Sequence, residues 1–227
     1  NPIGIWRPVS LSLDGGVSLD HVRIHTDLAG QVDVRLRLTN ATAVDWHGML
    51  ALTITADNHT GAGARRLIPV TLPPGTHAID QQLHLPDVHL WWCWDQGAPD
   101  LYRLEACLLD ETRQPISMHS ERFGVRTIRL ERHPQHFVYW LNERPVYIRG
   151  SSYMPALYLS QCSAATLAQD IDLARAAHLN LLRAHVHVAP PEFYAVCDAQ
   201  GMLVWQDFEL NWIQDPSPEF ERRARTL

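Results

Sequence analysis

Residues 32–38 read VDVRLRL, an unbroken alternation of apolar and polar side chains. A period of two is typical of a β-strand that turns one face toward a core and the other toward solvent. The same alternation recurs in residues 17–24, 49–55, 78–85 and 102–109. Turn-forming residues separate these segments at 14–16, 58–63 and 73–75. Short strands at this spacing predict an immunoglobulin-like β-sandwich of two sheets over residues 14–128.

The pattern changes after residue 128. Residues 137–148 indicate a hairpin that leads into a strand, and residues 164–177 have apolar residues at helical spacing behind Ser163, a suitable N-cap. There follow a strand over 181–188, a helix over 191–199 with Gly201 as its stop, a strand over 202–208 and a helix that begins at Ser217. Alternating strands and helices predict a parallel sheet, either doubly wound or closed into a barrel. No GxGxxG follows the first strand, which disfavours a dinucleotide-binding fold.

The composition is that of a globular protein, with 227 residues of which 46% are hydrophobic and 19% charged. A net charge of -6 without a basic stripe disfavours nucleic acid as a partner. No apolar run reaches the length of about 18 residues that a membrane helix needs. The four cysteines form no CxxC pair, so we expect free cysteines in the core rather than a zinc ribbon or a disulfide framework. The sequence opens NPIGIW, in the middle of a pattern, and we expect it to be a piece of a longer protein.

The candidate site lies where the predicted parallel strands end, because α/β folds place their active face at the carboxyl ends of the strands. Arg183, His185 and His187 are two apart on one predicted strand and therefore share a face. Three interpretations are open: binding of a polar ligand such as a sugar, metal ligation by the two histidines, or polar residues that cap a strand end. Arg183 disfavours the metal, since a fixed cation repels a dication.

The next strand end carries two carboxylates and several aromatic rings. Asp207 and Glu209 are two apart, but a retaining glycosidase needs carboxyl groups about 5–5.5 Å apart that flank the bond, and neighbours on one strand face one way. We therefore expect Asp207 to support the site. Trp205, Trp212 and Tyr153 lie near the same mouth, where aromatic rings can stack on a sugar, although large rings more often belong to a core.

Several strings that span nearly the whole chain together resemble family 2 glycoside hydrolases, the group of β-galactosidases, β-glucuronidases and β-mannosidases. They are residues 4–9 (GIWRPV), 90–102 (LWWCWDQGAPDLY), 123–128 (FGVRTI), 180–183 (NLLR), 192–194 (EFY), 197–198 (CD), 201 (G) and 205–208 (WQDF). The resemblance implies three regions. Residues 1–13 would be the tail of a sugar-binding jelly-roll domain, residues 14–128 an immunoglobulin-like sandwich, and residues 129–227 the first three βα units of a (β/α)8 TIM barrel.

The resemblance implies that the parent protein is a retaining exo-β-glycosidase that acts on a carbohydrate without a cofactor or metal. In this family the acid/base glutamate follows the fourth barrel strand within an Asn-Glu pair, and the nucleophile follows the seventh. The chain reaches only the third strand, and its single Asn-Glu pair, Asn142-Glu143, precedes the first. Both catalytic carboxylates are then missing, and we expect the chain alone to be inactive.

The predicted substrate-binding residues are Arg183, His185, Asp207, Tyr153 and Trp205. Arg183 resembles the arginine at the floor of the family's sugar site, and His185 and Asp207 correspond less closely. The string RAHVH at residues 183–187 matches neither the β-galactosidase nor the β-mannosidase pattern, so the sugar is not specified.

Two other functions remain open from the residues. The sandwich can be a carbohydrate- or protein-binding module without catalysis, or His185 and His187 can serve a metal-dependent hydrolase. An incomplete barrel leaves open strand edges and apolar faces. We therefore expect residues 129–227 to be unstable alone, or to associate with a partner chain or a second copy.

Overall fold

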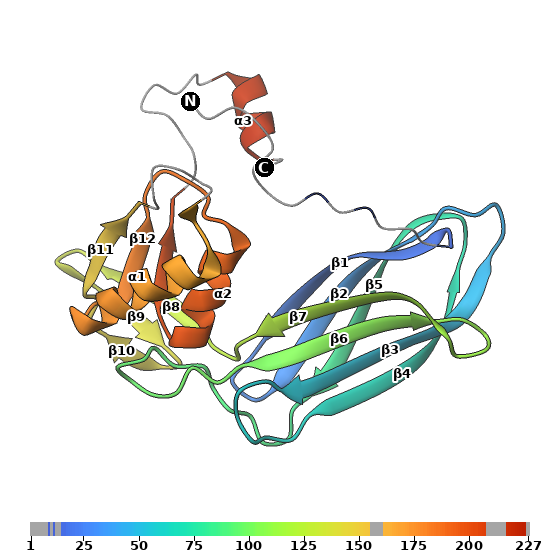
Figure 1. Cartoon of the computed structure of the whole chain (residues 1–227), viewed down its shortest axis with the longest axis horizontal. Helices are drawn as coiled ribbons and strands as arrows, with labels where there is room; N and C mark the ends of the chain where they lie inside the picture. The colour runs from blue at the N-terminus through green and yellow to red at the C-terminus, as the bar shows by residue number, and fades with distance from the viewer. Residues whose placement is uncertain (1–8, 10, 12–14, 155–160, 208–216, 226–227) are drawn as a thin grey trace.

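The computed structural model describes residues 9, 11, 15–154, 161–207 and 217–225, and these form a β-sandwich joined to a smaller α/β part (Figure 1). The predicted jelly-roll tail, residues 1–13, therefore lies outside the described residues except for positions 9 and 11. None of the described helices is long and apolar enough to span a membrane.

The sandwich contains two antiparallel sheets, with strand orders β1-β2-β5 and β4-β3-β6-β7. The strands are β1 (Val17–Thr26), β2 (Gln31–Asn40), β3 (Trp46–Ala56), β4 (Ala64–Leu72), β5 (Gly75–His84), β6 (Tyr102–Leu109) and β7 (Pro115–Phe123). The predicted sandwich is therefore present, and each of the five strands expected from alternation is found.

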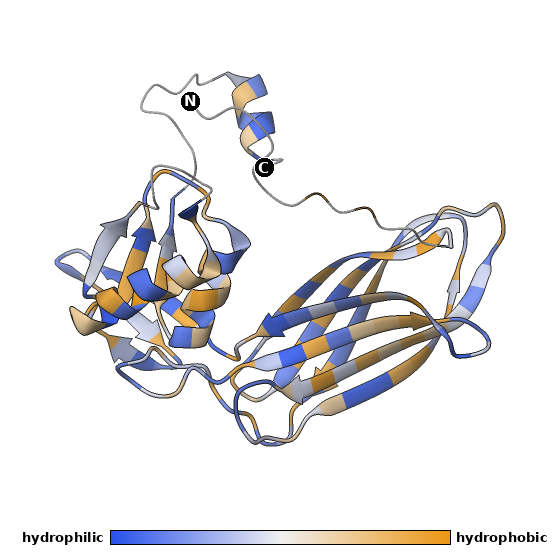
Figure 2. Ribbon diagram, viewed as in Figure 1, coloured by the Kyte–Doolittle hydropathy of each residue, from blue (hydrophilic) through white to orange (hydrophobic). Residues whose placement is uncertain are grey.

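The core of the sandwich is made by the apolar half of each alternating strand, as the orange and blue bands of Figure 2 show. Val32, Val34, Leu36 and Leu38 are almost fully buried, whereas the polar residues between them lie on the outer face or are partly covered. The inward residues of β3 and β6 meet them from the second sheet. Burial of apolar surface at about 25 cal/mol per Å² is what holds the two sheets together.

A third antiparallel sheet links the sandwich to the α/β part. It has the order β10-β9-β8 and consists of β8 (Ile128–His133), β9 (His136–Leu141) and β10 (Arg144–Val146). The turn of the predicted hairpin is Asn142-Glu143, and both residues have positive φ angles of 48° and 61°, the conformation that two-residue hairpin turns require. The Asn142 side chain is buried, where it accepts from Thr127 N and donates to the Trp91 carbonyl oxygen, each at 2.9 Å.

The α/β part is built on a parallel sheet of order β11-β12-β13, with β11 (Gly150–Tyr153), β12 (Leu181–Ala184) and β13 (Leu203–Gln206). Two helices, α1 (Ala164–Ala176) and α2 (Pro191–Gln200), cover one face of it. A third helix, α3 (Pro218–Ala224), follows. This order confirms the predicted strand–helix alternation. The closed eight-stranded barrel remains a prediction.

The ends of the helices follow from the residues expected to set them. The Ser163 hydroxyl oxygen accepts from Thr166 N and caps α1, Pro191 occupies the first turn of α2, and Gly201 ends α2 with φ 71°. A left-handed residue at this position is strained for any side chain other than glycine, and a Cβ on Gly201 would also lie 2.8 Å from Trp94 N.

One predicted strand is too long. The strand expected over residues 181–188 ends at Ala184, and His185 to His187 form a turn with Val186 at φ 49°. The expectation that Arg183, His185 and His187 share one face of a strand is therefore wrong beyond Arg183. A β-branched residue at positive φ cannot continue a strand, because its Cβ clashes with the backbone in that region.

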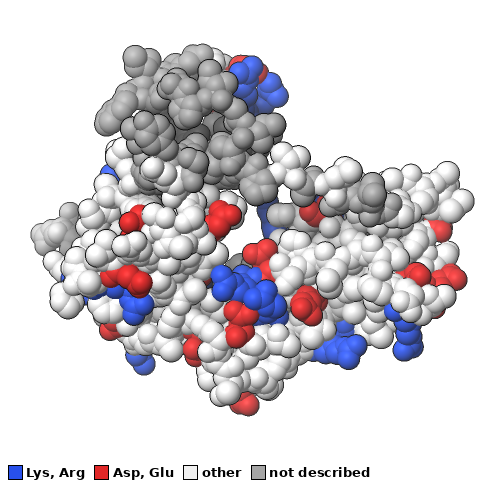
Figure 3. Space-filling model, viewed as in Figure 1, with Lys and Arg blue, Asp and Glu red and all other residues white. Residues whose placement is uncertain are grey.

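The two parts meet through an apolar cluster with charged groups around it. Trp91, Cys93 and Leu101 from the β5–β6 connection pack with Leu181 and Leu203 of the parallel sheet. Figure 3 shows acidic and basic side chains gathered near this junction. The ion pairs there include Arg103–Asp57 at 2.7 Å, Arg122–Asp57 at 3.7 Å and Arg126–Asp198 at 3.3 Å.

Candidate functional site

The candidate site lies at the carboxyl ends of β12 and β13, where the register places Arg183 opposite Trp205. Side chains alternate across a strand. Leu182 and Ala184 therefore pack under the helices, whereas Arg183 lies on the other face with Leu181. The residues next to it in the register on that face are Ser152 of β11 and Trp205 of β13. A polar group is thus held above an apolar floor on the face that no described helix covers.

Arg183 and Asp207 form a two-pronged ion pair at this site. Arg183 Nε lies 2.9 Å from Asp207 Oδ2 and 3.1 Å from Oδ1, and Arg183 Nη2 lies 2.7 Å from Oδ2. The guanidinium holds the pKa of the Asp207 carboxyl below its usual value, and the Val186 N–H adds to this effect. Asp207 therefore stays ionised and orients the guanidinium, which leaves the outer edge of Arg183 as a donor surface for hydroxyl groups.

The turn after β12 contacts the same Asp207 carboxylate. Val186 N donates to Asp207 Oδ2 at 3.3 Å, and His185 Nδ1 lies 3.7 Å from that oxygen without a hydrogen-bond partner. His187 Nδ1 bonds to the main-chain oxygen of its neighbour His185 at 2.9 Å. The two histidines thus have different surroundings, and no cluster of metal-ligating residues among the described positions includes either of them.

A second set of contacts, not foreseen from the sequence, fixes the segment that follows this turn. Gln206 Nε2 donates to the main-chain oxygen of His187 at 2.7 Å, and Tyr194 OH donates to Gln206 Oε1. The same Tyr194 oxygen accepts from Ala189 N at 3.2 Å. In the sequence, Tyr194 was singled out only as part of the string EFY, one of those that resemble the family.

The two predicted aromatic residues lie on opposite faces of the sheet. Trp205 is 48% exposed and meets the Tyr139 ring edge-on at 6.4 Å, beside Arg183 in the register. Tyr153 stacks on Phe193 at 5.1 Å and donates to Asp170 Oδ2 at 2.8 Å, so it lies on the helix side. Burial, and then this hydrogen bond, raise the pKa of its phenol. Glu209 and Trp212 lie outside the described residues.

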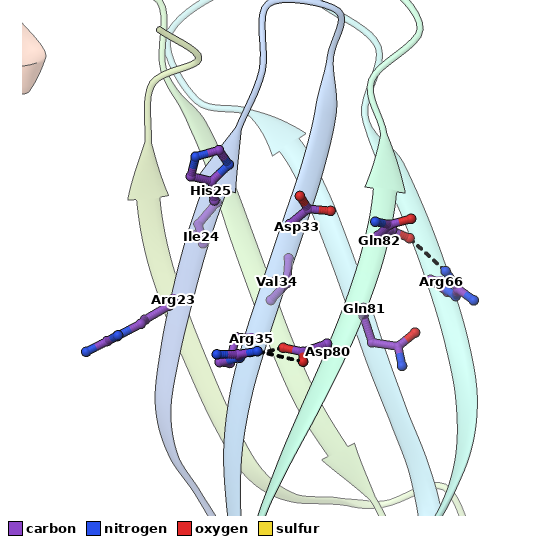
Figure 4. Close-up of a pocket in the computed structure, with 10 residues that line it drawn as sticks. All are labelled: Arg23, Ile24, His25, Asp33, Val34, Arg35, Arg66, Asp80, Gln81 and Gln82. Atoms are coloured by element: carbon purple, nitrogen blue, oxygen red, sulfur yellow. Dashed lines mark hydrogen bonds and ion pairs between the residues drawn. The ribbon is translucent and has the colours of Figure 1, made fainter. Parts of the chain in front are cut away.

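A larger hollow lies on the sandwich, over β1, β2 and β5 (Figure 4). Its volume is about 880 Å³. The residues that line it are Arg23, Ile24, His25, Asp33, Val34, Arg35, Arg66, Asp80, Gln81 and Gln82. Arg35 and Asp80 are paired with each other at 2.6 Å and are largely exposed. The lining offers hydrogen-bonding groups but no Trp, Tyr or Phe on which a sugar ring would stack.

Residues 17–126 match the family model described as glycosyl hydrolases family 2. The chain is 26% identical to a β-galactosidase of Aeromonas hydrophila over 91% of its own length and 20% of that protein. It is 25% identical to a mannosylglycoprotein endo-β-mannosidase of Lilium longiflorum over 92% of the chain and 23% of that protein.

Among solved structures, the fold is similar to that of a β-D-mannosidase from Dictyoglomus thermophilum. The TM-score is 0.81 and the identity 23%, over 93% of this chain and 27% of that one. The chain therefore spans about a fifth to a quarter of the length of the relatives it matches.

Proposed function

This chain is related to the family 2 glycosyl hydrolases, and we propose that it contributes the sandwich and the first βα units of a retaining exo-β-glycosidase. The observation that carries the proposal is the Arg183–Asp207 ion pair at the carboxyl ends of β12 and β13, beside an exposed tryptophan. In α/β folds this end of the strands is where substrates bind. A fixed guanidinium and an aromatic ring together suit a sugar, which offers hydroxyl groups at its edge and an apolar face.

Within the site, Arg183 would donate hydrogen bonds to the hydroxyl groups of the sugar that is released. Asp207 acts as the positioning residue, because it holds both the guanidinium and the turn at Val186. His185 lies at the edge of this pair, with its Nδ1 3.7 Å from Asp207 Oδ2, and would be a second contact for the substrate. Trp205 would border the sugar from the neighbouring strand. A contact between Tyr153 and the substrate remains a prediction. The Tyr153 ring lies on the helix side of the sheet, opposite Arg183.

The barrel proposal rests on the face of the parallel sheet that no described helix covers. Ile148, Leu181, Leu203 and Trp205, with Tyr139 and others, line an apolar hollow of about 120 Å³ on that face. In a closed barrel these residues would point inward and meet side chains from further strands. We propose three regions, residues 1–13, 14–128 and 129–227, with the last as the start of the barrel. The same face would drive self-association of the isolated chain, which analytical ultracentrifugation measures.

The catalytic glutamates would come from later strands of the barrel. Retaining glycosidases use one carboxyl group as acid/base and a second as nucleophile, about 5–5.5 Å apart. We propose that this chain supplies neither, and that Glu143, in the Asn142-Glu143 turn, has no part in the reaction. Its side chain lies 3.5 Å from Arg129 in the hairpin, and Asn142 is engaged in the junction.

The test is hydrolysis of a panel of nitrophenyl β-glycosides by this chain and by the full reading frame that encodes it. We expect turnover of at least one β-glycoside by the full protein and none by the chain. Absence of turnover by both, together with glycan binding that requires Arg35 and Asp80 in the hollow of Figure 4, would favour the alternative of a non-catalytic binding module.

A further inference from the structure

Three potential metal ligands meet at one end of the sandwich, away from the proposed sugar site. His59 belongs to the β3–β4 loop, and His89 and Asp100 belong to the long connection between β5 and β6. One ligand atom from each of the three residues lies within 4.8 Å of the others. It is the only such group of three among the residues that the structure describes. The sequence gives no sign of it, because the residues are far apart along the chain.

The two loops are tied together beside the cluster. Asn58 Nδ2 donates to the Pro99 carbonyl oxygen at 2.9 Å, and Leu101 N donates to Asn58 Oδ1 at 2.8 Å. Asp57 N donates to the Leu101 carbonyl oxygen at 2.8 Å. His59 and Asp100 are thus each adjacent to a hydrogen-bonded residue, and their positions are set before any ligand arrives. Such outer contacts are what orient the ligands of protein metal sites.

His89 is held by two further contacts. Its main-chain N donates to Tyr102 OH at 2.8 Å, and its Nδ1 lies 3.0 Å from Asp100 Oδ2. When one ring nitrogen of a histidine is hydrogen-bonded to a carboxylate, the other nitrogen is free to bind a metal ion. The bonded nitrogen can also bind the ion itself once it has lost its proton. The His89 side chain is 39% exposed, so it has room to turn toward an ion.

His59 is the feature that needs an explanation. Both of its ring nitrogens are shielded, and neither makes a hydrogen bond. The ring is stacked on His89 at 4.4 Å and meets Tyr102 edge-on at 4.7 Å. Two shielded ring nitrogens without hydrogen bonds normally cost stability, and an imidazole nitrogen is a common ligand of metal ions.

We propose that His59, His89 and Asp100 bind one divalent transition-metal ion, with Zn²⁺ as the best match. Two imidazoles and one carboxylate form a common set of three protein ligands for zinc, with water in the fourth position. Asp100 forms an ion pair with His89, itself a member of the cluster, whereas at the sugar site the carboxylate of Asp207 is already paired with an arginine. Two ligands on one zinc ion lie at most about 4 Å apart and each imidazole binds in its ring plane. The partly exposed His89 ring would therefore turn out of its stack on His59 to complete the site.

The ion would add a further link between two loops that hydrogen bonds and the stacking of His59 on His89 already connect. The β5–β6 connection also carries Trp91 and Cys93, which pack against the parallel sheet. A bound ion at the base of this connection would therefore stabilise the junction of the two parts. This role is structural and does not depend on the proposed glycosidase activity.

The experiment is a titration of the metal-free chain with ZnCl₂ by calorimetry, with Co²⁺ absorption as a spectroscopic check of imidazole ligation. We expect a saturable site of one ion per chain, and at least a tenfold loss of affinity in both His59→Gln and Asp100→Asn. The matched control is the double variant His133→Gln/His136→Gln. It removes another stacked histidine pair, at 4.7 Å on the β8–β9 hairpin, and should leave the affinity unchanged.

Thermal unfolding with and without Zn²⁺ keeps the test independent of how the variants fold. Zinc should raise the melting temperature of the wild type and of the His133/His136 control, but not that of His59→Gln. The proposal is overturned if zinc does not bind the wild type. It is equally overturned if binding survives His59→Gln and Asp100→Asn, or is lost with the hairpin pair instead.

Discussion

The Trp91 indole Nε1 donates a hydrogen bond to the main-chain oxygen of Asp198 at 2.7 Å, and so connects the sandwich side of the junction to α2. Trp91 is 1% exposed, and the guanidinium of Arg126 lies over its ring at 4.6 Å. Arg126 also pairs with the Asp198 side chain. One buried tryptophan thus holds two elements of different folds in a fixed relation.

Replacement of Trp91 by phenylalanine should weaken the junction. The variant keeps an aromatic ring but leaves the Asp198 carbonyl without its partner, and we expect a loss of about 1–3 kcal/mol in the free energy of unfolding. Urea unfolding followed by circular dichroism measures it. The matched control is Trp140→Phe, because the Trp140 indole also donates, to Glu131, but on the exposed hairpin. Equal losses in both variants would contradict the role of the junction.

Asn180 should be among the most sensitive polar residues of the α/β part. It is fully buried, accepts from Arg149 N at 2.8 Å, and donates to the Tyr147 carbonyl oxygen at 3.0 Å and Asp95 Oδ2 at 3.1 Å. Asn180→Ala leaves these groups unpaired, and we expect it to cost about 3 kcal/mol or more. Gln169→Ala, an exposed amide removed from α1, is the control and should change stability little. A small loss at Asn180 would show that water replaces these contacts.

The strained turn at Val186 predicts a gain of stability. A β-branched residue at φ 49° is held against its preference. Val186→Gly should therefore raise the free energy of unfolding by about 1 kcal/mol or leave it unchanged. Val138→Gly, in the extended strand β9, should lower it. If both substitutions destabilise equally, the turn is not strained.

The Arg183–Asp207 pair makes a prediction for acid conditions. The pKa of Asp207 is lowered from its ordinary value of 3.8. The pair therefore adds stability above the unfolded pKa, and this contribution is lost as the pH falls through the lower folded value. Asp207→Asn and Arg183→Gln should each flatten the loss of stability between about pH 5 and pH 2, and the double variant should resemble either single one. The measurement is the free energy of unfolding as a function of pH. A pH dependence in the variants as steep as that of the wild type would contradict the pairing.

The strands that the apolar–polar alternation predicted and the strands that it missed differ in their surroundings. The segment of β2 is covered on one face only, so its pattern is strict. β4 carries Arg65, Arg66 and Pro69, and it pairs with β3 alone. An edge strand tolerates proline because its outer N–H groups need no partner. β7 is also at an edge, and every residue of β8 is exposed. Only Val70 and Leu72 of β4 are buried, and no residue of β7 or β8 is. The buried face on which alternation depends is therefore short or incomplete in these strands.

The residues of the candidate site also fall into those that the sequence predicted and those that it did not. Arg183 and Asp207 were predicted from their places at the ends of strands, and the structure brings them into contact. The positions of His185 and His187 depend on where β12 ends, and the turn there makes a contact between Val186 N and Asp207, which follows β13. The site at His59 depends on the meeting of two loops. Contacts between distant segments leave no periodic trace in the sequence.

The central claim is that Arg183 binds the sugar in a glycosidase, and the most direct measurement is kcat/KM of the full reading frame on its best nitrophenyl β-glycoside. Arg183→Gln should lower kcat/KM about 10- to 100-fold, the effect of removing a charged hydrogen-bond donor. Arg132→Gln, an exposed arginine on β8, should leave it unchanged. An Arg183→Gln enzyme that stays folded and keeps the wild-type kcat/KM would contradict the account.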